Sequence, residues 1–392
     1  MILYKYILFI YMYSEYEELE KKNTNLKNVL GKYIKNNNLF NMIPSPKNIR
    51  YRNNIMFSFG FNKNKDIEVG PFEKENSKII LFPSDNNLVS DTGIQICNYM
   101  RDWVKNNSIL PITQYPSFEG FWRHIQIRHN LNNDIVICFR FSNFNIYLDE
   151  WKKEKYLLIN YLLTRPKFLE GKFKLVNICY QISNYKKEPL NTEPFYEIYN
   201  NNHLIETIQN KKFIITIPCF FQVNLYSSKY IYNIVKSLVI KNKNNILFDL
   251  CCGIGMYSIL LSDKFSRVFG IDNNIHNIKL ANENKLINKC RNILFYKDRV
   301  ENVIKGLIMS NPFNKTVIIN PPRRGLYDSL IDEINKNIKY IDQLIYISCN
   351  VESLKRDLDK LNLQNKTIKH IMPINQFPVS YTHLTLPTTP YV

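Results

Sequence analysis

Short apolar runs rich in β-branched residues recur in the second half of the chain, with segments of helical length between them. Such runs are typical of strands buried in a parallel sheet. A helix over 227–240 precedes the first run, and further helices are expected after Asn273 and Tyr327. This alternation predicts a doubly wound α/β domain over residues 211–379. Its predicted strands are residues 245–250, 267–272, 317–319 and 344–347.

The first half has shorter runs and a different order. Aromatic and β-branched residues predict strands at 54–61, 78–82, 122–128 and 135–141, and helices at 91–106 and 150–163. This pattern indicates a smaller α+β domain over residues 45–210. Before it, residues 1–44 form an N-terminal extension that includes a polar helix over 17–35, and residues 36–47 are expected to be a linker. The apolar stretch 1–13 is too short to span a membrane, because a membrane-spanning helix needs about 20 residues.

A glycine turn follows the strand at 245–250. Gly253 and Gly255 allow a tight turn with close backbone approach before a helix, whose first N–H groups favour a polar or anionic ligand. Asp272 ends the next strand about 20 residues later, at the spacing where a carboxylate reaches a ribose hydroxyl pair. Together these features predict a bound cofactor that contains a nucleoside.

Polar residues also follow the last two predicted strands. Asn320 begins the stiff loop Asn-Pro-Pro-Arg-Arg-Gly, in which Arg323 can meet a phosphate. Cys349 lies between Ser348 and Asn350, where a thiol would face a ligand beyond the carboxyl end of its strand. Taken alone, the loop is a rigid connection with exposed arginines, and a lone cysteine is more often a small buried hydrophobe.

The order of these motifs resembles the tRNA (uracil-5-)-methyltransferase family. Three further segments carry the resemblance: Phe-Phe-Gln-Val-Asn at 220–224, and the arginine-containing segments 51–54 and 120–128 of the first half. The resemblance implies a Rossmann-like class I methyltransferase domain preceded by a smaller α+β RNA-binding domain. It also implies S-adenosyl-L-methionine as cofactor and 5-methyluridine in RNA as product, most readily at the T-loop of a tRNA.

Roles for individual residues follow from the resemblance. Cys349 corresponds to the nucleophile that adds to C6 of the target uracil. The expected cofactor-binding residues are Gln222, Cys251, Gly253, Gly255, Asp272 and Asn320. The expected RNA-binding residues are Arg323, Asn350, Arg52, Arg123 and Arg128.

The chain departs from the family pattern at two places. Asn320 stands where the family has an aspartate, so it keeps hydrogen-bonding capacity but lacks the charge. The family also places a glutamate that removes the C5 proton shortly after a Phe-Pro segment, here residues 377–378, whereas no Asp or Glu follows Asp359. Residues 380–392 differ in composition from the rest and are expected to be a non-native tail. His383 within it is expected to be solvated rather than a base.

The composition is basic, and the sequence has no metal-binding motif. The 52 Lys and Arg residues exceed the 34 Asp and Glu residues by 18, which suits a polyanionic partner, although a lysine-rich solvated surface gives the same excess. The eight cysteines contain no C-x-x-C pair, so no zinc or iron–sulfur site is expected. We expect a monomeric intracellular protein, cytoplasmic or nuclear with an organellar location open, that binds RNA and no membrane.

Two other functions remain open from the sequence. The Asn-Pro-Pro loop is similar to that of amide or adenine N-methyltransferases, although Arg323 replaces their aromatic residue and their reaction needs no thiol. A module that binds or folds tRNA with little turnover would account for the missing glutamate.

Overall fold

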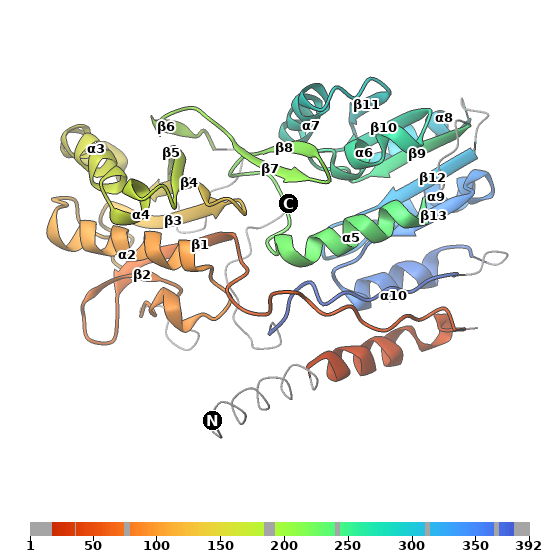
Figure 1. Ribbon diagram of the computed structural model, residues 1–392, viewed down its shortest axis with the longest axis horizontal. Helices are drawn as coiled ribbons and strands as arrows, with labels where there is room; N and C mark the ends of the chain where they lie inside the picture. The colour runs from red at the N-terminus through yellow and green to blue at the C-terminus, as the bar shows by residue number, and fades with distance from the viewer. Residues whose placement is uncertain are drawn as a thin grey trace. The chain divides into compact units, whose positions relative to one another are not determined.

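The structure is a computed structural model that describes residues 18–35, 37–73, 79–183, 193–239, 244–309, 314–363 and 368–379. The chain forms two compact units, shown as a ribbon in Figure 1. We call them the mixed-sheet unit (47–206 and 214–225) and the parallel-sheet unit (up to 46, 207–213 and 226–378). The chain has the α/β architecture predicted for it, with a mixed six-stranded sheet in one unit and a parallel five-stranded sheet in the other.

The mixed-sheet unit is built on six strands in the order β2-β1-β3-β4-β5-β6. Only the β4–β5 pair is parallel. The strands are β1 (Asn54–Phe61), β2 (Ile67–Gly70), β3 (Trp122–His129), β4 (Asp134–Phe141), β5 (Lys174–Ile182) and β6 (Tyr196–Tyr199). The helices are η2 (Pro83–Asp85), α2 (Asp91–Asn106), η3 (Phe144–Tyr147), α3 (Leu148–Leu163) and α4 (Pro166–Leu169). A separate two-stranded sheet joins β7 (Leu204–Ile208) and β8 (Lys211–Ile215).

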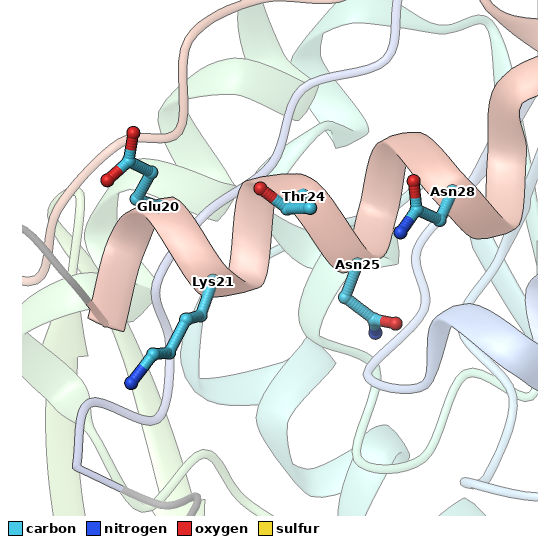
Figure 2. A pocket seen from close by; sticks show the side chains of 5 residues that line it. All are labelled: Glu20, Lys21, Thr24, Asn25 and Asn28. Carbon is cyan, nitrogen blue, oxygen red and sulfur yellow. The ribbon is translucent and has the colours of Figure 1, made fainter.

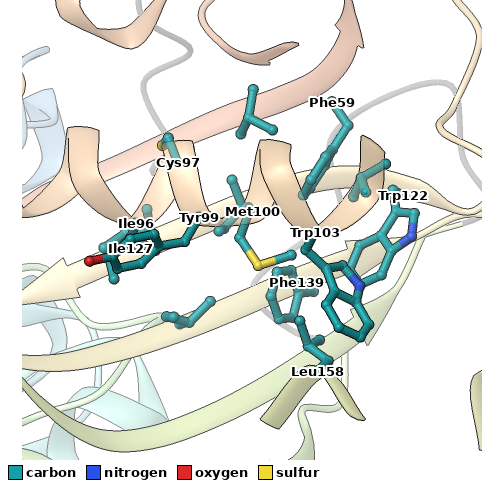
Figure 3. Close-up of a cluster of buried hydrophobic side chains, with 14 of the residues drawn as sticks. Phe59, Ile96, Cys97, Tyr99, Met100, Trp103, Trp122, Ile127, Phe139 and Leu158 are labelled. Carbon is teal, nitrogen blue, oxygen red and sulfur yellow. The ribbon is translucent and has the colours of Figure 1, made fainter. Parts of the chain in front are cut away.

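An aromatic core lies between this sheet and helices α2 and α3. Figure 3 shows Met100 and Trp103 of α2 packed among Phe59, Trp122 and Phe139 of the sheet. The alternation of apolar residues along β3 and β4 places their large side chains on this face, as a strand period of two requires. The prediction of strand 78–82 is wrong: Ile79 and Ile80 make only isolated bridges, because this short segment pairs at single positions with residues 61 and 72.

The parallel-sheet unit has five parallel strands in the order β11-β10-β9-β12-β13. They are β9 (Asn245–Leu250), β10 (Arg267–Asp272), β11 (Ile293–Lys297), β12 (Asn314–Ile319) and β13 (Gln343–Tyr346). The larger helices are α5 (Leu225–Leu238), α7 (Ile275–Ile287), α8 (Val300–Met309), α9 (Asp328–Asn337) and α10 (Val351–Lys360). The shorter ones are η1 (Gly31–Tyr33), α6 (Met256–Leu260), η4 (Ser262–Lys264) and η5 (Ile338–Tyr340).

Helices α8 and α9 pack on one face of this sheet, where their apolar residues join those of β9, β10 and β12 in one core. The last strand differs from its prediction as a fully buried strand. Among the described residues, β13 has a neighbour on one side only, and of its four residues Ile345 alone is buried. A strand at the edge of a sheet keeps part of its surface exposed, which the apolar run could not indicate.

The N-terminal segment belongs to the parallel-sheet unit. A helix over 18–30 is followed by residues that bridge a late segment of the chain, at Leu39 with Ile371 and at Ile43 with Ile374. The Lys22 ammonium donates to Asn375 Oδ1 (2.8 Å) and to the carbonyl of Phe377 (2.9 Å). The expectation of a linker over 36–47 is therefore wrong, because these residues have partners in the fold. No helix within the described ranges is long and apolar enough to cross a membrane.

Candidate active site

Four parallel strands end at one edge of the sheet. In register, Leu250 of β9 lies beside Ile271 of β10 and Ile319 of β12, and Ile319 lies beside Tyr346 of β13. The residues that follow these strands therefore meet at this edge, which we call the carboxyl edge. Eight of the predicted site residues lie at the ends of these strands or in the connections that follow them: Cys251, Gly253, Gly255, Asp272, Asn320, Arg323, Cys349 and Asn350.

The turn after β9 has a left-handed backbone at three positions. The φ angles are +61° at Cys251, +54° at Gly253 and +82° at Gly255. A Cβ atom at Gly253 would meet nothing within 4 Å, whereas one at Gly255 would lie 2.7 Å from the ring of Phe295. Gly255 thus permits close packing in the core, and Gly253 leaves open space above the turn. Such a φ at the non-glycine Cys251 is an uncommon conformation of the kind found at functional sites.

Asp272 holds this turn from the neighbouring strand. Its Oδ2 accepts a hydrogen bond from the backbone N–H of Gly253 (2.9 Å). Its Oδ1 accepts from the backbone N–H of Asn274 (2.9 Å) and the side-chain amide of Asn277 (3.2 Å). A carboxylate has about four acceptor positions, so Asp272 retains capacity for a ligand hydroxyl. The open space at Gly253 and this carboxylate fit the nucleoside part of S-adenosyl-L-methionine.

A second carboxylate at this edge was missed by the sequence analysis. Asp249, inside β9, is fully buried, and its Oδ2 accepts from the backbone N–H (2.9 Å) and hydroxyl (2.7 Å) of Ser258. Burial raises the pKa of Asp249 to about 7. The signal was present in the sequence, because an acidic residue within an apolar strand has to be protonated or paired.

Cys349 lies in the short connection between β13 and α10, and it is exposed, whereas the other cysteines are buried or half-buried. Partial burial of the sulfur raises the pKa of the Cys349 thiol, and the nearby Arg323 guanidinium opposes this shift without cancelling it. Burial, with Asp272 and Asp249 nearby, raises the pKa of the Cys251 thiol to about 12. Of these two thiols at the carboxyl edge, Cys349 is the more accessible one, and Arg323 acts on it through a side-chain hydrogen bond as well as through charge.

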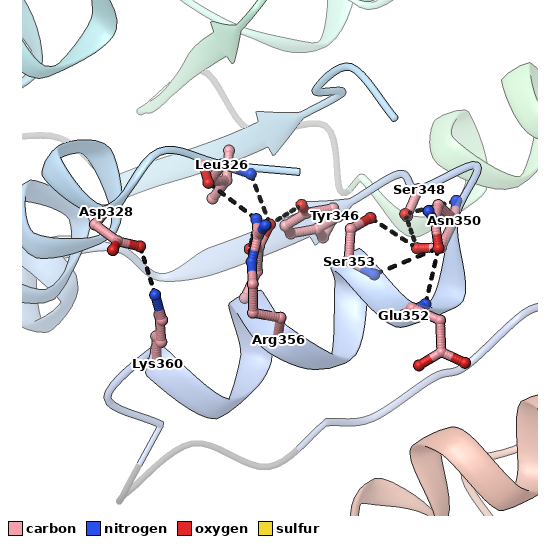
Figure 4. Close-up of polar contacts among 10 residues, drawn as sticks. Leu326, Asp328, Tyr346, Ser348, Asn350, Glu352, Ser353, Arg356 and Lys360 are labelled. Carbon is pink, nitrogen blue, oxygen red and sulfur yellow. Dashed lines mark hydrogen bonds and ion pairs between the residues drawn. The ribbon is translucent and has the colours of Figure 1, made fainter. Parts of the chain in front are cut away.

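Asn350 has a structural role that the sequence analysis did not predict. Its side-chain oxygen caps helix α10 by accepting from the backbone N–H groups of Glu352 (2.9 Å) and Ser353 (3.4 Å), as Figure 4 shows. The Ser348 hydroxyl donates to the carbonyl of Asn350 (2.8 Å). The side-chain oxygen expected to bind RNA is therefore committed to the start of the helix.

Two of the predicted RNA-binding arginines are wrong. Arg123 and Arg128 on β3 are each only 2% exposed. Arg123 donates to the carbonyl (3.0 Å) and hydroxyl (2.7 Å) of Ser183, and Arg128 donates to the carbonyls of Thr216 (2.6 Å) and Cys219 (2.9 Å). Their guanidinium groups satisfy backbone acceptors inside the mixed-sheet unit and are not placed to meet a phosphate.

The remaining predicted residues have mixed positions. Arg323 is exposed, Asn320 and Arg52 are half-buried, and the backbone N–H of Asn320 donates to the carbonyl of Leu250 (3.4 Å). Gln222 is half-buried in the mixed-sheet unit, and its role toward the cofactor stays a prediction.

One surface hollow lies away from this edge, along the helix over 18–30. Five side chains of that single helix line it, as Figure 2 shows: Glu20, Lys21, Thr24, Asn25 and Asn28. No nucleophile and no convergent set of charges lies among these five. Within the described ranges, no group of three or more His, Cys, Asp or Glu residues is arranged to hold a metal ion.

Comparisons with known proteins agree with the fold and the motifs. The family model for tRNA (uracil-5-)-methyltransferases matches residues 14–386. An uncharacterized RNA methyltransferase of Clostridium tetani is 27% identical over 346 residues, which cover 86% of this chain and 72% of that protein. The tRNA (uracil-5-)-methyltransferase homolog B of Pongo abelii is 24% identical over 357 residues, covering 86% of this chain and 72% of that protein.

A solved structure shows the same fold. It is the Pyrococcus abyssi tRNA (uracil-54, C5)-methyltransferase in complex with S-adenosyl-L-homocysteine, which is 22% identical. The two structures superpose with a TM-score of 0.68 over 93% of this chain and 80% of that one. The match of the family model over nearly the whole chain shows the family. The chain belongs to the tRNA (uracil-5-)-methyltransferase family and is an RNA methyltransferase that depends on S-adenosyl-L-methionine.

Proposed function

We propose that this protein methylates C5 of a uracil in the T-loop of tRNA through a transient bond between Cys349 and C6 of the base. The observation that carries this proposal is the position of Cys349. It is the exposed cysteine, and it follows β13 at the same edge of the sheet as the turn and the carboxylate that fit the cofactor. A flipped-out base that enters this edge can contact both the Cys349 thiol and the bound cofactor.

The choice of tRNA is supported by relatives and by charge. Homolog B of Pongo abelii is named a tRNA methyltransferase, and the Pyrococcus abyssi enzyme is named for uracil 54 of tRNA. An excess of 18 positive charges suits a partner of this kind, because Lys and Arg contacts to phosphates supply much of the affinity for RNA.

The proposed reaction has three steps: addition of the thiolate, transfer of the methyl group, and removal of the C5 proton with release of the thiolate. The Cys349 thiolate adds to C6, and the electron pair of the C5–C6 bond moves toward C5 and O4. Bound S-adenosyl-L-methionine would supply the methyl group that C5 takes up, with the electron pair of the broken S–CH3 bond staying on the sulfur of the departing S-adenosyl-L-homocysteine. A base then removes the C5 proton, and the electrons of that C–H bond restore the double bond as the thiolate leaves. Asp272 and the turn at Gly253 bind and orient the cofactor.

The raised pKa of Cys349 predicts how the reaction depends on pH. Thiolate is the reactive form, so the rate of adduct formation should rise from neutral pH through pH 8.5, the ordinary thiol pKa, without levelling off. Trapped protein–RNA adduct, quantified on denaturing gels at early times, measures this rate. A plateau below pH 8 would contradict a raised pKa in the state that reacts.

The test of the function compares wild type with Cys349→Ala, using labelled S-adenosyl-L-methionine and tRNA. Cys290→Ala is the matched control, because Cys290 is a buried cysteine away from the carboxyl edge. Labelled 5-methyluridine and a denaturation-stable adduct should form with wild type and Cys290→Ala and be absent with Cys349→Ala. An adduct without product would place the defect at proton removal.

Two outcomes would overturn the proposal. A labelled product other than 5-methyluridine that persists in Cys349→Ala would exclude the thiol mechanism and favour N-methylation at the Asn320 loop. Neither adduct nor product, with tRNA still bound, would favour the module that binds tRNA without turnover.

A further inference from the structure

A buried carboxylate on α10 contacts the chain segments after β12 and at the end of β13. Asp357 of α10 is fully buried. Its Oδ2 accepts from the backbone N–H of Leu326 (2.8 Å) and the hydroxyl of Tyr346 (2.5 Å). Its Oδ1 accepts from Nε of Arg356 (2.9 Å). Nη2 of Arg356 also donates to the carbonyl of Leu326 (3.0 Å), and Figure 4 shows these two residues close together. One carboxylate therefore joins a loop, a strand and a helix.

These three elements carry Arg323 and Cys349. Leu326 lies three residues after Arg323 in the loop that follows β12. Tyr346 lies three residues before Cys349, and α10 begins at Val351, two residues after it. Both chain segments that flank Cys349, and the segment that follows Arg323, are thus attached to the same side chain.

The hydrogen bonds of Asp357 fix the loop, the strand and the helix relative to one another. Hydrogen bonds to an ionised carboxylate are shorter and stronger than neutral ones, and burial with a paired guanidinium makes their loss costly. The loop also approaches very closely: a Cβ at Gly325 would lie 2.5 Å from Asp357 Oδ2, and this glycine has φ +79°. The loop is therefore held against α10 with no room for a side chain between them.

We propose that Asp357 is a positioning residue that sets the distance between the Arg323 guanidinium and the Cys349 thiol through Leu326 and Tyr346. The proposal rests on the role proposed above for Cys349. Asp357 is too deeply buried to touch RNA, so it acts through the chain segments that carry the guanidinium and the thiol. Arg323 is the charged group that acts on the thiol and favours its thiolate form, so a loosened loop should leave a less reactive thiol.

Two variants test this role against a matched control. Asp357→Asn removes the charge, and Tyr346→Phe removes one hydrogen bond while keeping the ring. The control is Asp328→Asn, because exposed Asp328 also contacts α10, accepting from Lys360 at 2.6 Å on the surface (Figure 4). Thermal melting and S-adenosyl-L-methionine binding show whether each variant is folded.

The first readout is independent of the methyl-transfer reaction. The rate at which iodoacetamide alkylates Cys349, followed on its peptide by mass spectrometry, is measured as a function of pH. We expect the profile to move to higher pH in Asp357→Asn and Tyr346→Phe, with a rate at neutral pH lower by about threefold, half a pKa unit. In the Asp328→Asn control the profile should stay at its wild-type position.

The second readout is steady-state kinetics with tRNA. Misplaced reacting groups lower kcat, and we expect a loss of about 10- to 100-fold in Asp357→Asn. KM for S-adenosyl-L-methionine should stay near the wild-type value, because the residues that fit the cofactor follow β9 and β10 and are not bonded to Asp357.

The alkylation profile decides the outcome. Wild-type profiles in folded Asp357→Asn and Tyr346→Phe would overturn the positioning role. If Asp357→Asn does not fold, the profile of Tyr346→Phe decides by itself whether the role stands. If the wild type forms neither adduct nor product, the proposed function fails, and the alkylation profiles still decide whether Asp357 sets the environment of Cys349.

Discussion

Two carboxylates of the parallel-sheet unit lie on neighbouring strands in different environments. Asp272 accepts hydrogen bonds from three N–H donors of the turn and the following helix. Asp249 is enclosed within β9 and accepts both of its hydrogen bonds from Ser258 on Oδ2, while Oδ1 has no hydrogen-bond partner among the described residues. The environment, rather than the residue type, suits the first for binding a ligand and raises the pKa of the second to about 7.

The environment of Asp249 predicts a pH dependence of stability. Its pKa is raised to about 7 in the folded protein, against an ordinary 3.8, so its contribution is fully present below pH 4 and is lost as pH rises through 7. Asp249→Asn lacks this dependence. The stability of wild type relative to Asp249→Asn should therefore fall by a few kcal/mol (on the order of 1.4 per pKa unit) between pH 4 and pH 8.

Parallel thermal or urea unfolding of the two proteins across this range measures the difference. A difference that is constant with pH would show that Asp249 has the same protonation state in the folded and unfolded chains.

The position of a site residue could be predicted from sequence where the residue directly follows a strand. Cys349 and Asp272 were placed correctly at the ends of parallel strands, because strand ends share one edge of a sheet. Arg123 and Arg128 were misassigned, because a period of two shows that residues share a face and not what covers that face. Asp357 was missed because its partners are distant in sequence, Leu326 by 31 residues.

At the scale of elements, the packing of β10 against β11 requires a glycine at position 270, because no side chain fits there. A Cβ at Gly270 would lie 2.4 Å from Cδ1 of Phe295 on β11, closer than atoms can approach. Gly306, inside helix α8, has nothing within 4 Å of the same position. The two glycines therefore differ in what they contribute to the fold.

These two positions give a matched pair of substitutions. Gly270→Ala should destabilise the protein by about 1–3 kcal/mol through overpacking. Gly306→Ala should stabilise it by up to about 1 kcal/mol, because alanine is the better helix former. Urea unfolding measures both changes. Equal effects at the two sites would mean that Phe295 moves aside without cost.

Element prediction succeeded where local pattern decides. Strand β1 and helix α2 have the predicted bounds, since alternation and an N-cap at Ser90 mark them locally. It failed for residues 36–47, which pair with residues near 371 and 374. No local pattern reports a partner more than 300 residues away.

At the scale of the whole molecule, the charge excess predicts how RNA binding responds to salt. Binding that releases counterions from phosphates weakens linearly with the logarithm of salt concentration, with a slope of roughly −0.7 per neutralised phosphate of a single strand. With 52 Lys and Arg against 34 Asp and Glu, we expect a steep slope for tRNA. Filter binding over a series of KCl concentrations measures it.

A shallow slope would assign most of the positive charge to a solvated surface with no part in RNA binding. The product assay run at the same salt concentrations would then separate weaker binding from slower chemistry.

The pairing of residues 39–43 with residues 371–374 has a consequence for biosynthesis. On the ribosome, the N-terminal segment emerges first, yet its partners are translated some 330 residues later. At about 5–20 residues per second, that interval is on the order of tens of seconds. During this time the apolar residues Leu39 and Ile43 lack their native partners, so we expect this stretch of the nascent chain to stay open to chaperones until residues 371–374 have been translated.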